Sequence, residues 1–202
     1  MLSKNELFFK RSFDIAFSLA GLIFLFPIII SAWMIACIVT KKNGFFIQDR
    51  VGQEGAIFRV IKIRTMKIDE SISTTVTQKA DPRITAIGIF FRKTKVDELP
   101  QLWNVLKGDM SFVGPRPDVV GYADKLKGED RKILSIRPGI TGPAQLAYKN
   151  EENILALHKN PIKYNDEIIW PHKIRINLDY VSNYSFKNDI YLIMKTIIGR
   201  NE

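Results

Sequence analysis

Residues 15–40 read IAFSLAGLIFLFPIIISAWMIACIVT and contain no charged side chain. A straight helix rises about 1.5 Å per residue, so this run would reach about 39 Å, long enough to cross a bilayer. It is longer than the apolar region of a secretory signal peptide, and no small-residue cleavage site precedes the next polar sequence. We therefore expect residues 15–40 to be a membrane segment rather than a signal peptide.

Pro27 lies in the middle of this run. Proline removes a backbone donor and clashes with the preceding turn, so it can break the helix into two arms of about 20 Å, each too short to span. Lys10 and Arg11 precede the run and Lys41 and Lys42 follow it. Positive charge favours the cytoplasmic side, which a re-entrant helix-break-helix satisfies at both ends. A kinked helix that crosses once is equally compatible, because membrane helices tolerate proline.

The composition favours an anionic partner. The chain has 202 residues, with 30 Lys and Arg against 21 Asp and Glu, a formal net charge of +9. Nucleic acid, anionic lipid and a phosphorylated substrate all fit this excess, and composition does not choose among them. The single cysteine, Cys37, excludes a disulfide framework within one chain. We divide the chain into a membrane segment, residues 1–42, and a polar remainder, residues 43–202.

The polar remainder predicts a mainly helical α+β fold with one β-hairpin and several amphipathic helices. Residues 45–64 alternate as two strands around a Gly-Gln-Glu-Gly turn. Residues 69–81 are polar and predict a surface loop. The apolar spacing of residues 99–107 predicts a helix that Gly108 ends. Residues 186–197 carry a helical apolar stripe.

The most informative pair is Asp97-Glu98, which precedes Leu99-Pro100. Proline is favoured at the first helical position, so both carboxylates are expected at or just before a helix N-terminus. A cap at Thr94 would give nearly the same placement. Phosphate binds well at such ends, and Mg²⁺ is usually held by one or two carboxylates plus substrate phosphates. One carboxylate could attack phosphorus while the other holds the metal or moves a proton. Simple helix capping is the alternative.

Several cations accompany the acidic pair beside hairpin ends or rigid turns. A pyrophosphate needs fixed cations to neutralise the charge of the transition state, and turns hold side chains in fixed places. We predict a phosphate site from Lys62, Arg64, Arg92, Arg116 and Arg137. There is no P-loop and no Gly-x-Gly-x-x-Gly, and His158 and His172 lack a metal-ligand spacing.

Five ordered motifs together resemble the bacterial sugar transferase family, specifically its small monotopic phosphoglycosyl transferases. The resemblance covers nearly the whole chain. The motifs are KRSFD at residues 10–14, KIRTM at 62–66, DELPQLWNVLKGDMS at 97–111, VGPRP at 113–117 and RPGITG at 137–142.

The resemblance implies a membrane enzyme with a re-entrant helix on the cytoplasmic face of the bacterial inner membrane. It implies that Asp97 takes a phospho-sugar from a UDP-sugar, releases UMP and passes the phospho-sugar to undecaprenyl (polyprenyl) phosphate. This would be the first membrane step of a glycoconjugate pathway. Mg²⁺ would lie near Asp97 and Glu98. Lys62, Arg64, Arg92 and Arg116 match basic family positions, and Asp179 matches an acidic position near the active site.

The resemblance also bears on the partners. It implies membrane lipid as a partner and no nucleic acid, and it is compatible with a homodimer. Two hypotheses compete with the transferase. One is a non-catalytic membrane-anchored module that binds anionic lipid or nucleic acid, and the other is a nucleotide-sugar hydrolase that uses the same carboxylates.

The second turn departs from the family pattern. Pro143 replaces a tryptophan that is frequent in the family, and Lys149, which is expected to bind substrate, stands where arginine is common. Lysine keeps the charge but loses the bidentate fork of arginine. Residues 151–171 form a longer stretch than in the shortest members, and the sequence assigns it no function.

Overall fold

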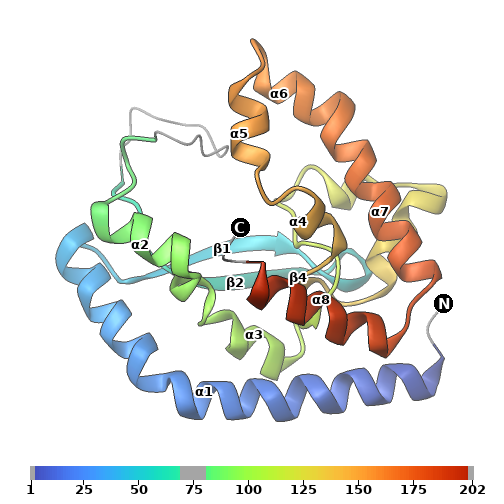
Figure 1. The fold of residues 1–202 in the computed structure, drawn as a ribbon, viewed down its shortest axis with the longest axis horizontal. Coiled ribbons are helices and arrows are strands. Elements are labelled where there is room, and N and C mark those ends of the chain that lie inside the picture. The colour runs from blue at the N-terminus through green and yellow to red at the C-terminus, as the bar shows by residue number, and fades with distance from the viewer. Residues whose placement is uncertain (1–2, 69–80, 200–202) are drawn as a thin grey trace.

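A computed structural model describes residues 3–68 and 81–199 of the chain (Figure 1). Its longest element is α1, Lys4–Thr40, a helix of 37 residues. A capping box begins α1: Oγ of Ser3 accepts from the Glu6 amide at 3.3 Å, and the Glu6 carboxylate accepts from the Ser3 amide at 2.7 Å. Lys41, with a left-handed φ of 53°, ends the helix.

Pro27 lies inside α1, and helical structure continues through it. Figure 1 shows that α1 runs along the base of the molecule and then turns upward in its second half. The expected helix-break-helix is therefore one bent helix, because a proline removes one backbone hydrogen bond and leaves those of the adjacent turns. The re-entrant path stays a prediction, as does the division at residues 1–42 and 43–202.

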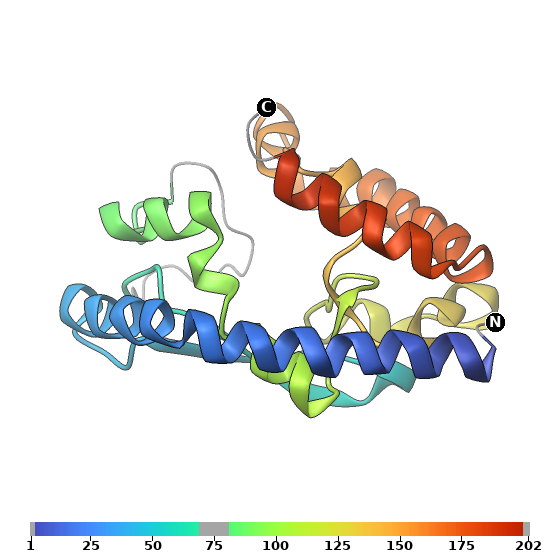
Figure 2. The same ribbon diagram turned by 60° about the horizontal axis from the view of Figure 1, so that its bottom comes forward.

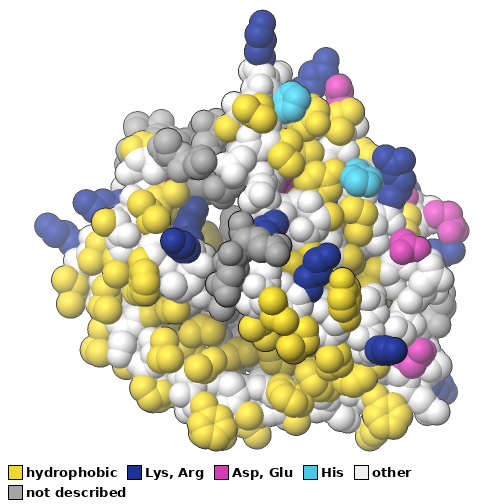
Figure 3. All heavy atoms as spheres, in the orientation of Figure 1, with side chains coloured by type: hydrophobic (Ala, Val, Ile, Leu, Met, Phe, Trp, Pro, Cys, Tyr) yellow, Lys and Arg dark blue, Asp and Glu magenta, His cyan; other side chains and the backbone are white. Residues whose placement is uncertain are grey.

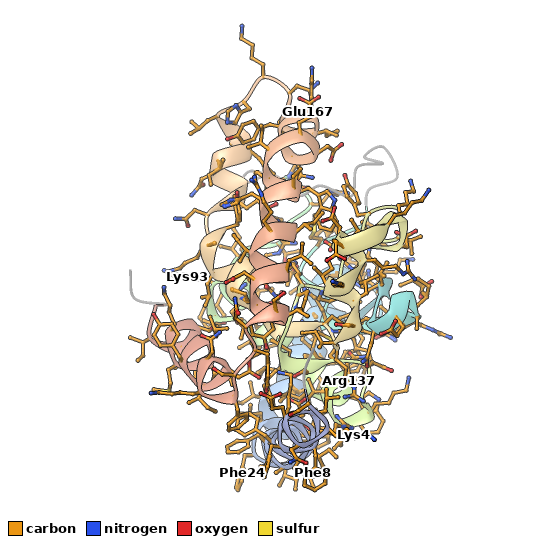
Figure 4. The ribbon with its side chains drawn as sticks, turned by 90° about the vertical axis from the view of Figure 1, so that its right-hand side faces the viewer. Lys4, Phe8, Phe24, Lys93, Arg137 and Glu167 are labelled. Atoms are coloured by element: carbon orange, nitrogen blue, oxygen red, sulfur yellow. The ribbon has the colours of Figure 1, made fainter. Side chains whose placement is uncertain are left out.

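One face of α1 packs against the rest of the protein, and its other faces are exposed. Among the described residues, α1 is the one helix long and apolar enough to cross a membrane; the mean hydropathy of its most apolar stretch is 2.7, and 17% of that stretch is buried. Phe24 is 78% exposed. Figure 4 shows Phe8 and Phe24 pointing away from the rest of the protein, and Figure 3 shows hydrophobic side chains gathered along this edge. Ala32 and Ala36 are buried, because small side chains let the helix approach the domain closely.

The predicted hairpin is confirmed. Strands β1, Phe45–Val51, and β2, Ile57–Ile63, pair antiparallel, with Phe45 opposite Ile63 and Val51 opposite Ile57. A 3-10 turn, η1, Gln53–Gly55, joins them, and Glu54 and Gly55 adopt positive φ values. The hairpin provides the strands on which the next elements pack.

The helix predicted before Gly108 is also confirmed, as α3, Gln101–Lys107; Gly108 ends it with a φ of 100°. Before it come α2, Ala86–Thr94, and a 3-10 turn, η2, Val96–Glu98. Asn104 fastens α3 to β2. Its Oδ1 accepts from the Ile61 amide at 3.1 Å, and its Nδ2 donates to the Arg59 carbonyl at 2.7 Å.

A second, parallel strand pair was not expected from the sequence. β3, Ser111–Val113, lies beside β4, Gly139–Thr141, with Ser111 opposite Gly139. The chains approach so closely that a Cβ at Gly139 would lie 2.1 Å from the Gly114 amide nitrogen. Strands of three residues give no recognisable alternation, so only the two rigid turns were visible in the sequence.

The C-terminal third is helical, as expected. It packs on the parallel pair through a core of Val113, Ile136, Tyr180, Val181 and Leu192. Figures 1 and 2 show α7 and α8 meeting where the chain passes from one to the other, with α8 above α1. The elements are η3 Ala123–Lys125, η4 Gly128–Ser135, α4 Pro143–Ala147, α5 Glu151–Ala156, α6 Pro161–Tyr164, η5 Asn165–Ile169, α7 Trp170–Ser182 and α8 Phe186–Ile198.

The expected fold class is confirmed at the coarse level: the described residues are mostly helical, with small sheets. An interfacial position for the amphipathic helices stays a prediction. The surface loop expected at residues 69–81 lies, apart from its last residue, outside the described residues.

The start of α1 is fastened to the domain by buried polar groups. Nζ of Lys10, which is 6% exposed, lies 2.5 Å from Oδ2 of Asp189 and 2.8 Å from the Val113 carbonyl. Arg11 donates to the carbonyls of Val105 and Leu106 at 2.7 and 2.8 Å. Both cations precede the apolar run, and each has protein acceptors that replace water.

Candidate active site

The acidic pair lies in the tight connection between α2 and α3. Lys95, with a left-handed φ of 60°, ends α2, and Asp97 and Glu98 occupy the 3-10 turn that follows. Their expected position just before a helix is confirmed. The alternative cap at Thr94 is wrong, because Thr94 is the last residue of α2 and its Oγ1 donates back to the Phe90 carbonyl at 2.8 Å.

The carboxylate of Asp97 is buried, but one of its oxygens lacks a hydrogen-bond partner among the described residues. Asp97 is 8% exposed, and Oδ1 is the oxygen without a partner among those residues. Burial, followed by the negative charge of Glu98, raises the pKa of Asp97 to about 6. The carboxylate is therefore ionised at neutral pH and has an oxygen free to bind something else.

Glu98 has the opposite electrostatic character. Its Oε1 lies 3.3 Å from Nζ of Lys62 and 3.9 Å from Nζ of Lys95. Burial alone would raise its pKa, but the charges of Lys62, Lys95 and Arg116 outweigh burial and lower the pKa to about 2. Burial also lowers the pKa of Lys62, against the influence of Glu98. Glu98 is thus a permanent anion with a fixed cationic partner.

A pocket opens beside this ion pair. It is lined by cations from three segments, with Glu98 as its acidic group: Arg50 from β1, Lys62 from β2 and Arg116 from the turn after β3. Gln101, the first residue of α3, also lines it. The structure therefore brings two of the predicted cations, Lys62 and Arg116, to the acidic pair.

Arg92 approaches the acidic pair from α2. Its Nε donates to Oγ1 of Thr65 at 3.0 Å, and its Nη2 to Sδ of Met66 at 3.0 Å. Its charge is one of those that lower the pKa of Asp97, against burial and Glu98. These contacts hold the guanidinium on the Asp97 side of the site.

Two predicted arginines bond elsewhere to backbone carbonyls. Arg64 donates to Asn43 at 2.8 Å and to Phe45 at 3.2 Å, at the start of the hairpin. Arg137 donates through Nε to the Gly108 carbonyl at 2.7 Å, at the end of α3. Figure 4 shows Arg137 close to α1. In this structure both stabilise the scaffold, and their phosphate-binding role stays a prediction.

The hydrogen bonds of Lys149 and Asp179 also go to residues outside the acidic pair. Lys149 donates to the Gly199 carbonyl at the end of α8. Asp179 is exposed on α7, and its Oδ1 accepts from Nδ2 of Asn183 at 2.7 Å. Neither residue lines the pocket beside Glu98.

The sequence reasoning missed Arg50 and Asp118. Asp118 directly follows the Gly-Pro-Arg-Pro turn, and its backbone carbonyl accepts from the Val51 amide at 2.9 Å. Burial, against the charges of Arg116, Lys173 and Arg50, raises the pKa of Asp118 to about 6. Its position next to a predicted turn was a usable signal. Arg50 gave none, because a strand arginine is usually solvated and only the folded hairpin brings it to the turn.

The acidic pair is compatible with Mg²⁺. Within residues 3–68 and 81–199, no group of three or more His, Cys, Asp or Glu side chains forms a metal site. Mg²⁺ commonly takes one or two carboxylates and completes its shell with phosphate oxygens and water. The unpartnered Oδ1 of Asp97 and the adjacent Glu98 carboxylate fit that kind of partial site.

Comparisons with known proteins place the chain in a family. The family model described as bacterial sugar transferase matches residues 5–200. Galactosyl transferase CpsE of Streptococcus agalactiae is 36% identical over 96% of this chain and 42% of its own length. Undecaprenyl-phosphate galactose phosphotransferase of Salmonella typhimurium is 33% identical over 97% of this chain and 41% of its own length.

A third relative matches along nearly its full length. Exopolysaccharide production protein PSS of Rhizobium leguminosarum is 35% identical over 96% of both chains. Several of the other relatives are longer, and the chain spans about two fifths of their length. These matches confirm the predicted family and its phosphoglycosyl transferase kind, and we conclude that the chain belongs to the bacterial sugar transferase family.

Proposed function

We propose that this chain is a phosphoglycosyl transferase. It would transfer a sugar-1-phosphate from a UDP-sugar to undecaprenyl (polyprenyl) phosphate, through a covalent intermediate on Asp97. The observation that carries the proposal is the buried carboxylate of Asp97, whose Oδ1 has no partner among the described residues and which adjoins a cation-lined pocket. The name of the Salmonella relative supports the acceptor class.

In the first step, a carboxylate oxygen of Asp97 attacks the phosphorus that carries the sugar. The bond from that phosphorus to the oxygen of UMP breaks, so UMP leaves and an acyl phosphate forms. A pKa of about 6 keeps Asp97 ionised, and thus nucleophilic, at neutral pH. Lys62 and Arg116, on the Glu98 side, would neutralise charge on the leaving phosphate.

Glu98 does different work from Asp97. With a pKa of about 2 it holds no proton to donate at neutral pH, so it is unsuited to act as a general acid. We assign it to charge organisation, because it fixes Lys62 at 3.3 Å. Asp97 and Glu98 would hold Mg²⁺, which would supply positive charge and so reduce the repulsion between the carboxylates and the donor phosphates.

In the second step, an oxygen of undecaprenyl phosphate attacks the same phosphorus and releases Asp97, giving a polyprenyl diphosphate sugar. The acceptor is a membrane lipid, so the site must lie at the depth of the lipid phosphate. The exposed apolar surface of α1, with Phe8 and Phe24 pointing outward, suits association with a membrane (Figure 4). We place the enzyme as a monotopic protein on the cytoplasmic face of the bacterial inner membrane, in an early membrane step of glycoconjugate synthesis.

The test is UMP release by the detergent-solubilised chain. The protein is incubated with a panel of UDP-sugars, Mg²⁺ and undecaprenyl phosphate, with Asp97→Asn as the paired variant. We expect release that requires both the acceptor and Asp97. Full turnover without acceptor would identify a hydrolase instead. Lipid binding that Asp97→Asn leaves intact, together with no UMP release from any donor, would identify a non-catalytic binding module.

A further inference from the structure

Arg50 reaches from the hairpin to the edge of the candidate active site. Its Nη1 donates to the Pro117 carbonyl at 3.1 Å, and its Nη2 donates to Oε1 of Gln48 at 2.6 Å. Its Nε is buried and has no partner among the described residues. A buried guanidinium nitrogen without an acceptor is costly, because it has lost water and gained nothing in exchange.

Positive charge outweighs negative charge around Arg50, because Arg116 acts on it more strongly than the opposing carboxylate of Asp118 does. Arg50, Lys62 and Arg116 line one pocket, and the acidic group that lines it, Glu98, is already paired with Lys62 at 3.3 Å. Burial, followed by the positive charge of Arg116, lowers the pKa of Arg50 to about 10. Clustered cations repel one another, so an anion that enters from outside would relieve both the repulsion and the unpartnered donor.

The position of the pocket indicates which anion it takes. Glu98 lines it and Asp97 does not, so the pocket lies beside the nucleophile rather than over it. A phosphate one linkage away from the attacked phosphorus would occupy such a place. We propose that Arg50, together with Arg116, binds the phosphate of the UMP moiety, and that it still holds this phosphate when UMP becomes the leaving group. This rests on the proposed function, because it assigns a part of the same donor.

A purely structural role for Arg50 would leave its unpartnered Nε and its place in the pocket unexplained. Arg50 could serve only as a latch between the hairpin and the turn after β3, which its bond to Pro117 and the adjacent bond from the Val51 amide to the Asp118 carbonyl already form. Such a latch uses Nη1. It accounts neither for the unpartnered Nε nor for the exposure of Arg50 to a pocket that it shares with Lys62 and Arg116.

The experiment measures UMP binding without turnover. The full chain carrying Asp97→Asn is titrated with UMP and, separately, with uridine, by calorimetry in detergent. Arg50→Gln is then added to this background, and Arg59→Gln is the matched control because Arg59 is an exposed arginine of the same hairpin that does not line the pocket. We expect Arg50→Gln to weaken UMP binding about 10- to 100-fold, the loss of one or two charge-assisted hydrogen bonds. Arg59→Gln should change it less than about twofold, and uridine binding should be the same in both variants.

A conservative variant separates binding from scaffold damage. Arg50→Lys keeps a cation but loses the fork, so we expect UMP binding between that of the parent and that of Arg50→Gln. In the active chain, Arg50→Gln should raise the KM for the UDP-sugar and the inhibition constant of UMP, and leave the KM for undecaprenyl phosphate unchanged. Equal UMP affinity in the Arg50→Gln and Arg59→Gln chains would overturn the proposal, as would a rise confined to the KM of the acceptor.

The two proposals fail separately. If UMP binds and Arg50→Gln weakens it while no UDP-sugar is turned over, the transferase assignment falls and the phosphate site stands. If sugar transfer proceeds and UMP affinity does not depend on Arg50, the phosphate site falls and the transferase stands.

Discussion

Nζ of Lys62 lies 3.3 Å from Oε1 of Glu98, while Oδ1 of the preceding residue, Asp97, has no partner among the described residues. The environment thus gives the two adjacent carboxylates different pKa values. Glu98 has a pKa of about 2 and Asp97 a pKa of about 6. Each of the predictions about the acidic pair follows from this difference.

Transfer activity should depend on the ionisation of Asp97. Its pKa of about 6 means that the carboxylate is protonated, and not nucleophilic, at lower pH. We expect kcat/KM for the UDP-sugar to be level above about pH 7 and to fall about tenfold per pH unit below pH 6. Glu98→Gln removes a charge that raises the pKa of Asp97, so the inflection of its residual activity should move to lower pH. An inflection that stays in place would contradict the assignment.

Asp97→Asn should stabilise the protein at alkaline and neutral pH. The folded pKa of Asp97 is raised from 3.8 to about 6, so the folded chain binds the proton more tightly than the unfolded chain and loses stability as pH rises through this window. A neutral asparagine avoids that loss. We expect the variant to gain about 1–3 kcal/mol in the free energy of unfolding above pH 6, and no gain below about pH 3.8. Denaturant unfolding at pH 8 and pH 3.5 measures both; a gain equal at the two values would refute the electrostatic explanation.

Asn104→Ala should loosen α3 from the hairpin. Asn104 is 1% exposed, and its removal leaves the Ile61 amide and the Arg59 carbonyl without their side-chain partner. We expect a loss of about 2–3 kcal/mol in the free energy of unfolding. Asn153→Ala, at an exposed position on α5, is the control and should change it by less than about 0.5 kcal/mol. Similar unfolding midpoints for the two variants would show that the Asn104 bonds contribute little.

Lys10→Met should test the buried attachment of α1. It leaves Asp189 with Tyr180 and Tyr184 as donors but without a counter-charge. We expect a loss of about 3–5 kcal/mol, and the double variant Lys10→Met with Asp189→Leu should recover part of it. Lys93→Met is the control, because Lys93 is exposed on α2 (Figure 4). Equal stability of the Lys10→Met and Lys93→Met chains would show that the Lys10–Asp189 pair contributes little to the attachment of α1.

The sequence predicted those features that depend on neighbouring residues. The hairpin at β1 and β2, the helix ended by Gly108 and the position of Asp97 and Glu98 before it all follow from local spacing and turn chemistry. The remaining features depend on contacts between distant segments. The parallel pairing of β3 with β4 joins residues far apart in the chain, and no local sequence pattern predicts it.

The cations of the candidate site likewise differ in whether a local pattern or a contact between distant segments positions them. Lys62 could be predicted at the site because it lies near the end of a strand, at the start of a motif, and Arg116 because a rigid turn carries it. Arg137 has the same kind of turn, yet its bond to the Gly108 carbonyl is decided by where α3 ends in space. Arg50 lines the pocket only because the hairpin folds against the turn after β3.

The proposed mechanism depends on covalent attachment of the donor's phospho-sugar to Asp97. The direct measurement is mass spectrometry of the chain after incubation with its UDP-sugar and Mg²⁺ in the absence of undecaprenyl phosphate. We predict one phospho-sugar on the peptide that contains Asp97, its disappearance when undecaprenyl phosphate is added, and no adduct in Asp97→Asn. An active enzyme that forms no adduct on this peptide, or an Asp97→Asn chain that transfers at the parental rate, would contradict this mechanism.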